Sequence, residues 1–392
     1  MVPNGWIQAT LGDLVHKSAF GPRFTSELYS KDGAIGTIRT TDLYNDGEIN
    51  YATIPYADLD VSEYEEHVLN EGDLLITRSG TCGIPCIFTE QEKPIIAGAF
   101  LIRFQLNERV NSKFLHEVLK SSPVQSSIKR MAAGGVQKNL TGTSLKKLHL
   151  ALPPLPEQRK IAKILSTWDK AISTTEKLIE TSKQQKKALM QQLLTGKKRL
   201  VNPETGKAFE REWEEVKLAE LCKIGTGKKD ANDGSPSGKY PFFTCAKRPI
   251  LSSSYSYDFE ALLIAGNGVI GTTHYYNGKF EAYQRTYILS EFRAVFVAYL
   301  HHWINFYLKR GVDREKQHGA MPYIKVGMLQ NFKVKLGSYS EQQKIASVLT
   351  AADKEIEVLE AKLAHFKQEK KALMQQLLTG KRRVKVADME VA

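Results

Sequence analysis

The chain has 392 residues, 42% of them apolar and 25% charged, as is typical of a globular protein with two or three domains of roughly 150 residues each. A formal net charge of +12 indicates a polyanionic partner or an anionic surface. No apolar run reaches the roughly 20 residues that span a bilayer, the first residues do not resemble a secretory signal, and four cysteines are too few for a disulfide framework. We therefore expect a cytoplasmic protein with no membrane partner.

Residues 1–155 are expected to form a first globular domain of mixed strands and helices. Short apolar runs such as DLLITRSG and AFLIRFQL predict strands, and FLHEVLKSS predicts a helix. The loops between these runs carry hydrogen-bond donors. Because Arg and Lys suit guanine edges, Asn and Gln suit adenine edges, and Ser, Thr and Lys suit phosphates, these loops are candidate DNA contacts. The candidates are Arg39, Thr40, Arg78, Ser79, Thr81, Gln137, Lys138 and Asn139.

The next segment, residues 156–196, predicts one long helix. Apolar side chains recur at alternating spacings of four and three, which is the pattern of a coiled-coil seam. Gly196 lies where the end of a helix favours left-handed backbone. A helix of about 38 residues is a rod of about 57 Å. The seam residues are Ile161, Leu165, Trp168, Ile172, Ile179, Leu189 and Leu193.

A polar, basic linker over residues 197–212 precedes a second globular domain over residues 213–339. Runs such as ALLIAGNG and TYILSEF predict strands, and VAYLHHWINFYLK predicts a helix. Residues 266–271 match G-x-G-x-x-G formally, but Asn277-Gly278 predicts a hairpin turn where a dinucleotide site would need a helix. The candidate DNA contacts of this domain are Lys228, Lys229, Thr244, Lys247, Asn267, Arg285, Lys316 and Gln317.

The second half of the chain repeats the first. Residues 341–384 align without a gap with residues 157–200, and both contain KKALMQQLLTGK. Chance does not plausibly produce such a match. The two globular domains also open on the same pattern, a tryptophan followed by two leucines. These openings are Trp6, Leu11 and Leu14 in the first domain and Trp213, Leu218 and Leu221 in the second.

A second long helix is therefore predicted over residues 340–381, followed by a tail over 382–392. Polar Thr175 and Ser182 in the first seam correspond to Leu359 and Phe366 in the second, so the two copies would complement each other as partners. The alternative is that each helix packs only on its own domain. The seam residues of the second copy are Ile345, Leu349, Ile356, Leu359, Leu363, Phe366, Leu373 and Leu377.

Both seams contain a lysine, Lys186 in the first and Lys370 in the second. A lysine buried in the seam would fix the register or the orientation of the helices at some cost in stability. A lysine that snorkels would keep its ammonium group at the edge of the coil. The sequence leaves these two interpretations open.

Motifs of catalysis are missing from the sequence. It holds no Walker A motif, no G-x-S-x-G, no H-E-x-x-H, and no Asn/Asp-Pro-Pro-aromatic tetrapeptide of an adenine methyltransferase. Cys82 and Cys86 have no second pair and no nearby histidine, so we interpret them as ordinary thiols. We expect neither a catalytic residue nor a metal site in this chain.

The expected fold class is α+β. It comprises two mixed α/β domains, each followed by a long helix, with the two helices paired as an antiparallel coiled coil that has internal pseudo-twofold symmetry. Antiparallel pairing of the rods would place the domains at opposite ends of the pair. Such a protein suits two-headed recognition of a linear polymer, and the positive charge favours DNA.

The doubled E-Q-x-K-I-A-x-[IV]-L…KKALMQQLLTGK helices resemble those of the specificity (S) subunits of type I restriction-modification enzymes. The runs GDLLITRSGT at residues 72–81 and KYPFFT at residues 239–244 support the resemblance, which covers nearly the whole chain. It implies that each globular domain is a target recognition domain that reads one half of a split DNA site. It also implies that the helices are conserved spacer regions that set the separation of the half-sites.

The resemblance further implies a chain without an active site, the non-catalytic subunit of a complex that acts as an adenine-specific DNA methyltransferase and site-specific deoxyribonuclease. The partners would be double-stranded DNA, two modification (methyltransferase) subunits, and restriction/translocase subunits. S-adenosylmethionine, ATP and Mg would be cofactors of those partners, with none in this chain. The poor match between the two recognition domains implies an asymmetric target.

A protein-binding coiled-coil adaptor without sequence-specific DNA binding is the alternative. It would explain the long helices but neither the charge of +12 nor the paired globular domains. Ionic strength separates the two, because affinity that depends on several phosphate contacts falls steeply with added salt.

Overall fold

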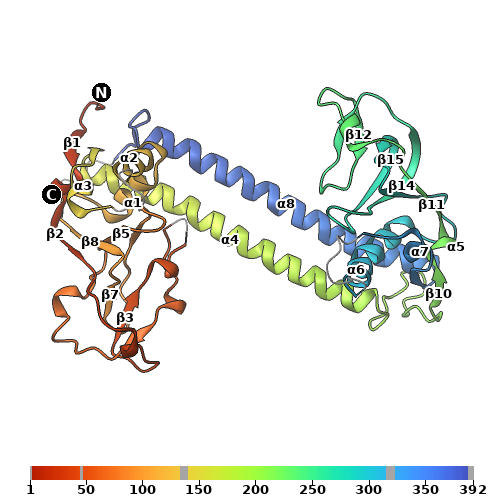
Figure 1. Ribbon diagram of the computed structural model, residues 1–392, viewed down its shortest axis with the longest axis horizontal. Coiled ribbons are helices and arrows are strands. Elements are labelled where there is room, and N and C mark those ends of the chain that lie inside the picture. The colour runs from red at the N-terminus through yellow and green to blue at the C-terminus, as the bar shows by residue number, and fades with distance from the viewer. Residues whose placement is uncertain (1, 45–46, 133–139, 315–322, 387–392) are drawn as a thin grey trace. The chain divides into compact units, whose positions relative to one another are not determined.

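The computed structural model describes residues 2–44, 47–132, 140–314 and 323–386. The chain divides into two compact units, unit 1 with residues 1–175 and 362–392, and unit 2 with residues 176–361. Helices α4 (Leu155–Leu193) and α8 (Tyr339–Leu377) each run unbroken for 39 residues from one unit into the other. A mixed α/β domain followed by a long helix, twice over, is thereby confirmed (Figure 1).

Unit 1 contains three small sheets. Strands β1 (Ile7–Thr10) and β9 (His149–Leu152) pair antiparallel. A second sheet has the order β2-β8-β5-β6 and a third the order β4-β3-β7. Their strands are β2 (Val15–Phe20), β3 (Ile35–Ile38), β4 (Tyr56–Ala57), β5 (Leu74–Thr77), β6 (Pro85–Ile87), β7 (Ile95–Ala97) and β8 (Leu101–Leu106). The helices are α1 (Ser112–Lys120), α2 (Ser122–Ala132) and α3 (Gly142–Lys146), with 3-10 turns at Leu11–Leu14, Ser26–Leu28, Thr40–Asp42, Tyr51–Thr53 and Glu65–His67.

Unit 2 contains two sheets. Strands β10 (Glu214–Lys217) and β17 (Lys333–Leu336) pair antiparallel, as β1 and β9 do in unit 1. The larger sheet has the order β11-β16-β14-β15-β12-β13. Its strands are β11 (Lys223–Thr226), β12 (Tyr240–Phe243), β13 (Ile250–Ser252), β14 (Tyr257–Ala265), β15 (Thr273–Ala282) and β16 (Thr286–Ser290). The helices are α5 (Leu218–Leu221), α6 (Val297–Arg314) and α7 (Val326–Gln330), with a 3-10 turn at Ala231–Asp233.

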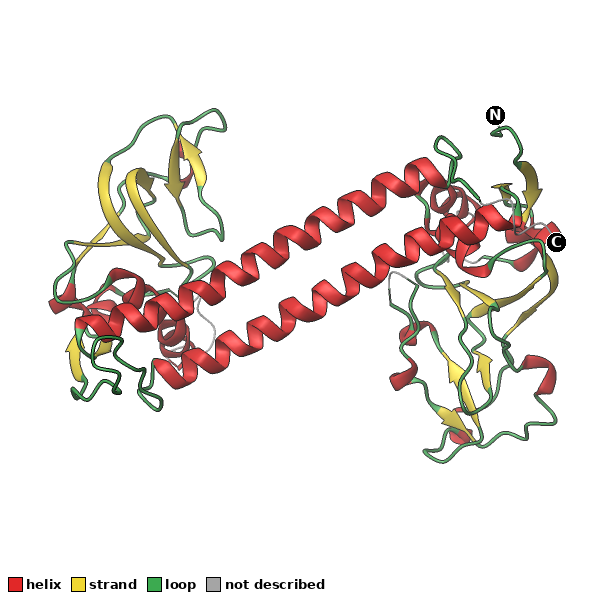
Figure 2. Ribbon diagram, turned by 180° about the vertical axis from the view of Figure 1, so that it is seen from behind, coloured by secondary structure: helices red, strands yellow, loops and turns green. Residues whose placement is uncertain are grey.

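The two units share one strand topology although their sequences differ. In unit 1 the antiparallel order is β2-β8-β5, and in unit 2 it is β11-β16-β14. The parallel pair of β3 with β7 recurs as β12 with β15. Figure 2 draws the strands of both units in yellow. Strand β15 pairs antiparallel with β14 and parallel with β12. In unit 1 two strands share these pairings, since β6 pairs antiparallel with β5 and β7 pairs parallel with β3. The repeat seen in the helices extends to the domains.

The hairpin predicted at Asn277-Gly278 is wrong. Strand β15 continues through both residues, which pair with Glu260 and Phe259 of β14. Gly278 has a φ of +127°, a conformation that glycine adopts without strain. Pairing along the whole length of β14 therefore outweighs the local preference of an Asn-Gly pair for a turn.

The core of each domain continues into the long helices. In unit 1, buried residues of β5, β8, α1 and the first turns of α4 form one cluster, and in unit 2 those of β14, α6 and the first turns of α8 do the same. Neither domain is therefore closed without a long helix. The cluster of unit 1 includes Leu74, Ile76, Phe104, Phe114, Ile161, Leu165 and Leu377, and that of unit 2 includes Leu262, Ile264, Tyr299, Trp303, Ile345, Leu349 and Leu193.

The seam residues face the partner helix in each unit. In unit 1, Trp168 of α4 meets Phe366 of α8 edge to face, with ring centroids 5.6 Å apart. In unit 2, Ser182 of α4 donates to Glu355 of α8 at 3.2 Å. Early residues of α4 thus contact late residues of α8, and the reverse, so the helices pair antiparallel in each unit. Along its middle the stripe faces one partner helix, and at its ends residues such as Ile161 and Ile345 also belong to the domain cores.

A buried glutamate lies in the first turns of each long helix. Glu341 of α8 is fully buried and accepts two hydrogen bonds from Arg199, which follows α4, at 2.7 and 2.8 Å, and one from Trp213 Nε1 at 2.9 Å. In unit 1, Glu157 of α4 accepts from Arg383, which follows α8, at 2.7 Å twice. Trp6 Nε1 donates to Glu157 at 3.3 Å. We call these the Glu341 cluster and the Glu157 cluster.

The glutamine after each of these glutamates attaches the domain to the helix. Gln158 accepts from the backbone N–H of Asn111, just before α1, at 2.8 Å, and Gln342 accepts from that of Phe296, just before α6, at 2.8 Å. Gln158 also donates to the carbonyl of Pro153 at 2.9 Å. The Glu-Gln pair of the repeat thus joins a helix end, the opening tryptophan and the domain.

The seam lysines are paired with aspartates. Lys370 is 8% exposed and donates to Asp169 of α4 at 2.6 and 2.7 Å, with Glu117 of α1 at 3.0 Å. Lys186 pairs with Asp353 at the equivalent place of unit 2. The Lys370 ammonium is therefore buried and bound, in agreement with the register interpretation and not with snorkelling.

Two buried histidines predict a pH dependence of stability. Burial lowers the pKa of His116 on α1 and of His302 on α6 from 6.5 to about 4. Because both pKa values are lower in the folded chain, the unfolded chain takes up protons at a higher pH than the folded chain does. The contribution of the two neutral histidines to the free energy of unfolding is therefore complete above pH 6.5. It is lost towards pH 4, by up to about 3 kcal/mol for each histidine.

We expect the urea midpoint to fall between pH 6.5 and about 4, and His302→Gln to flatten that fall. The exposed His365 on α8 provides the matched control, since His365→Gln should leave the pH dependence unchanged. A His302→Gln protein whose midpoint falls as steeply as that of the parent would contradict this prediction.

Candidate nucleic-acid interface

Four loops of unit 1 meet at one edge of its sheets. They follow β2, β3 and β5 and precede β8. The backbone N–H of Gly21 donates to Leu101 at 3.4 Å, that of Gly98 to Ile38 at 2.8 Å, and that of Arg78 to Phe100 at 3.0 Å. Loops far apart in the sequence are therefore held side by side. We call these four loops the loop edge of unit 1.

Unit 2 builds the same edge with the same bonds. The backbone N–H of Gly227 donates to Thr286, that of Tyr283 to Phe243, and that of Gly266 to Arg285, each at 3.0 Å. Arg285 thus holds the place of Phe100, and Gly266 that of Arg78. The framework of the edge is shared, and the side chains that it presents are different.

Every described DNA-contact candidate of unit 1 lies on this edge. Arg39 and Thr40 follow β3, and Arg78, Ser79 and Thr81 follow β5. The Arg78 guanidinium lies 4.3 Å from the ring centre of Phe20, a cation–π contact. Arg39 donates to the buried Asp42 at 2.9 and 3.0 Å, which fixes its guanidinium while leaving the side chain 45% exposed. Fixed, exposed arginines suit the recognition of base edges or phosphates.

A cleft of about 420 Å³ opens on the loop edge of unit 2. Asn267, Gln284 and Arg285 line it together with Tyr323 and Lys325. The other described candidates of this unit lie on the neighbouring loops, Lys228 and Lys229 after β11 and Thr244 and Lys247 after β12. Most of these groups are hydrogen-bond donors, and Asn267 and Gln284 also offer an acceptor. This combination can read the edges of base pairs.

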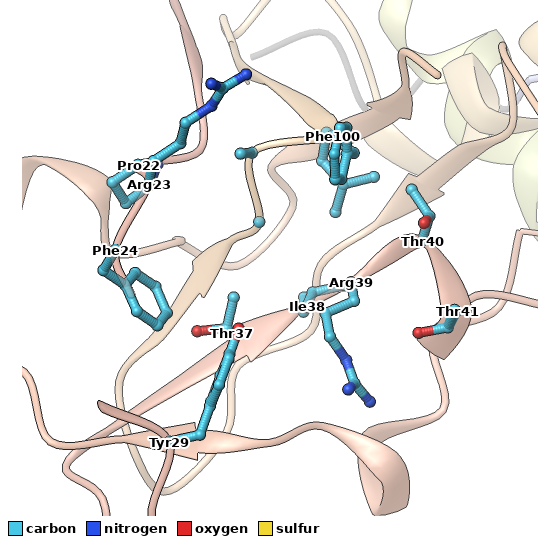
Figure 3. Close-up of a pocket in the computed structure, with 13 residues that line it drawn as sticks. Pro22, Arg23, Phe24, Tyr29, Thr37, Ile38, Arg39, Thr40, Thr41 and Phe100 are labelled. Carbon is cyan, nitrogen blue, oxygen red and sulfur yellow. The ribbon is translucent and has the colours of Figure 1, made fainter. Parts of the chain in front are cut away.

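A larger cleft of about 530 Å³ opens on the loop edge of unit 1. Phe24, Tyr29 and Phe100 line it together with Thr37 and Arg39 (Figure 3). Sequence reasoning missed the aromatic residues, because exposed and buried aromatics look alike in a sequence. Phe100 stands in the apolar run AFLIRFQL, yet β8 begins one residue later and Phe100 is 57% exposed.

Five predicted contacts fall outside the described residues. They are Gln137, Lys138, Asn139, Lys316 and Gln317. Tyr323 and Lys325, which line the cleft of unit 2, were not predicted. Among the helices of the described ranges, none is long and apolar enough to cross a membrane.

Comparison with known protein families gives one match over most of the chain. A family model described as the type I restriction modification DNA specificity domain matches residues 3–183 and 210–368. These two segments contain both loop edges, the Glu157 and Glu341 residues, and most of both long helices. The match therefore concerns the whole architecture.

Similar proteins point the same way. The EcoDI specificity subunit of Escherichia coli, a type I restriction enzyme subunit, is 37% identical over 171 residues, which are 43% of this chain and 37% of that protein. The putative MjaX specificity subunit of Methanocaldococcus jannaschii is 26% identical over 409 residues, with 98% of this chain and 95% of that protein covered. The chain thus spans about a third of the first relative and nearly all of the second.

Solved structures share the fold. The S subunit of a type I restriction-modification system from M. genitalium has a TM-score of 0.68 at 17% identity, covering 96% of this chain and 98% of that one. A chain from a study of complex assembly in the type I R-M system has a TM-score of 0.56 at 18% identity, covering 97% and 100%. With the family model over most of its length, the chain belongs to the family of type I restriction-modification DNA specificity proteins.

Proposed function

We propose that this chain is the sequence-specific DNA-binding specificity subunit of a type I restriction-modification complex, and that it reads a bipartite, asymmetric site. One observation carries the proposal. The two loop edges have the same framework of strands and backbone bonds but differ where a base would be read, with Phe100 in one and Arg285 in the other. A shared framework with different reading groups suits two different half-sites.

The physical form of recognition follows from these groups. Basic residues such as Lys228 and Lys247 contact phosphates and hold the domain in place on the duplex. Arg285 suits the O6 and N7 acceptors of a guanine, and Asn267 suits the N6 and N7 groups of an adenine. The net charge of +12 supports the attraction to DNA, with the salt dependence that attraction implies.

Catalysis belongs, in this proposal, to partner subunits. Two methyltransferase subunits would methylate adenine with S-adenosylmethionine, and restriction subunits would use ATP and Mg for translocation and cleavage. This chain would bind DNA and hold those subunits without a catalytic step of its own. The repeated construction supports two equivalent docking places, because each unit presents the same paired helices with an Arg-Glu-Trp cluster.

A methylome map tests the proposal. In cells that express this chain with its methyltransferase partner, we expect one new split motif with N6-methyladenine in each half. Arg285→Ala should relax one base pair in one half-site and leave the other unchanged. A lost base contact costs about 1–3 kcal/mol, so discrimination at that base pair should fall about 10- to 100-fold.

Lys223→Ala provides the control, because Lys223, the first residue of β11, forms an exposed ion pair with Glu291, which follows β16. This variant should give the parent motif. A change in both half-sites with Arg285→Ala would contradict reading by separate domains. No new methylation from an assembled complex would favour the protein-binding adaptor.

A further inference from the structure

The cleft in unit 1 is lined by two phenylalanines and a tyrosine, whereas the aromatic residues that line the cleft of unit 2 are Tyr287 and Tyr323. Phe100 stands on one side, and Phe24 and Tyr29 stand on the other (Figure 3). Phe100 is 57% exposed and Tyr29 38% exposed. The phenylalanine rings offer no hydrogen-bond donor that could read a base-pair edge, and Tyr29 offers only its hydroxyl. Their faces instead suit the flat face of an unstacked base, as in proteins that bind single-stranded nucleic acids.

Cationic groups surround the same cleft. Arg39, whose guanidinium is fixed by Asp42, and the exposed Arg23 both line it. Arg78 lies against Phe20 at the neighbouring loop. A base that leaves the helix stays attached to its sugar and two phosphates, so a site for it needs an aromatic slot with cations beside it. The cleft of about 530 Å³ lies within the usual size range of a small-molecule site.

An unused polar group lies in the wall. Thr37 is 2% exposed, and its hydroxyl has no hydrogen-bond partner within the described part of the chain. Buried hydroxyls are nearly always satisfied, so such a group is a candidate for a partner that arrives with a ligand. The polar rim of a nucleobase carries several donors and acceptors that would serve.

We infer that the cleft of unit 1 binds a single unstacked nucleobase of the DNA site, one that is everted from the duplex and is distinct from the adenines to be methylated. The inference rests on the proposed function and extends it. Unit 2 reads base edges with Arg285 and Asn267, whereas unit 1 grips a base by its faces between Phe100 and Tyr29. Arg23 and Arg39 hold the adjoining phosphates.

Mismatched duplexes test this site. A protein that everts a base must break a base pair, so a mismatch that keeps the everted base removes part of that cost and tightens binding. The complex of this chain with its methyltransferase partner is titrated with duplexes of its methylome-defined motif. Each duplex has one mismatch in the half-site that Arg285→Ala leaves unchanged. We expect about tenfold or more tighter binding at one position besides the methylated adenine.

Three variants assign that gain to the cleft. Phe100→Ala should abolish it, and Thr37→Val, which removes the hydroxyl and keeps the shape, should reduce it. Tyr44→Ala is the control, because Tyr44 is 52% exposed in the same unit but does not line the cleft. A gain that survives Phe100→Ala, or no gain at any position while the matched duplex binds well, would overturn the inference. Failure of the matched duplex to bind above a scrambled one would overturn the proposed function as well.

Binding of free nucleotides shows whether the base in the cleft comes from the DNA duplex or from a free nucleotide. Each deoxynucleoside monophosphate is added to the complex at millimolar concentration, with and without the matched duplex. We expect no binding that depends on Phe100 without the duplex, because the phosphates on both sides of the everted base supply part of the attraction. Phe100-dependent binding of a monophosphate with no gain at any mismatch would assign the cleft to a free nucleotide and overturn the inference.

Discussion

Replacing Glu341 with alanine is expected to lower the free energy of unfolding by about 3–5 kcal/mol, because it leaves Arg199 and Trp213 beside a cavity without their shared acceptor. The carboxylate is 1% exposed and accepts three hydrogen bonds. Water therefore does not readily replace it as the acceptor for Arg199 and Trp213. Urea unfolding at neutral pH measures the loss.

The repeat supplies a second case and a control. Glu157→Ala removes the same carboxylate from unit 1, where Arg383 and Trp6 lose it, and a loss of similar size is expected. Glu360→Ala breaks an exposed pair with Lys183 on the long helices and should cost less than about 1 kcal/mol. If the three variants unfold at the same urea concentration, the Arg-Glu-Trp clusters do not stabilise the units as the geometry requires.

Replacing Lys370 with alanine is the other change of large effect, about 3–5 kcal/mol. Lys370 forms ion pairs with Glu117 on α1 and with Asp169 on α4, and Glu117 is 6% exposed. Burial raises the pKa of Glu117, but Lys120 and Lys370 outweigh it and hold that pKa below its usual 4.5. Glu117 therefore stabilises unit 1 above pH 4.5, and this contribution is lost as the pH falls through its folded value.

A compensating variant shows whether the buried charge is the cause. The double change Lys370→Met with Glu117→Leu replaces the pair by apolar groups of similar size and should restore most of the lost stability, as measured by urea unfolding. Lys183→Ala, at the exposed pair with Glu360, is the control and should change little. A double variant as unstable as Lys370→Ala would show that the lysine matters for another reason.

The helices and strands were predictable because their apolar residues follow simple periods. The spacing of the stripe from Ile161 to Leu193 predicts a long helix, although its ends pack into the domain cores, and runs such as ALLIA predict strands of a sheet. The Glu157 and Glu341 clusters left a signal too, since the tryptophan, the Glu-Gln pair and the arginine recur together in both halves. Their physical role required the structure, because Glu157 and Arg383 meet only after folding.

The loop edge was predictable only in part. The sequence predicted contacts at polar residues on loops, and the structure places Arg39, Arg78, Asn267 and Arg285 on the loop edges of the two units. The sequence could not show that Asp42 holds Arg39, or that Phe100 lies outside the strand that its neighbours form. Exposure of an aromatic ring depends on where a strand begins, and a run of apolar residues does not fix that point. The turn predicted at Asn277-Gly278 is wrong for a related reason, because pairing of β15 with β14 determines the backbone conformation there.

Arg383 closes the cluster of Glu157, although 226 residues of sequence separate the two. Unit 2 is one continuous segment, whereas unit 1 needs both the first residues and the last. On the ribosome the domain that emerges first is therefore completed last. Until α8 is synthesised, the core cluster that contains Ile161 and Leu165 lacks Leu377. The order of translation is thus the reverse of the order of completion, and the nascent N-terminal half must stay soluble while the second half is made.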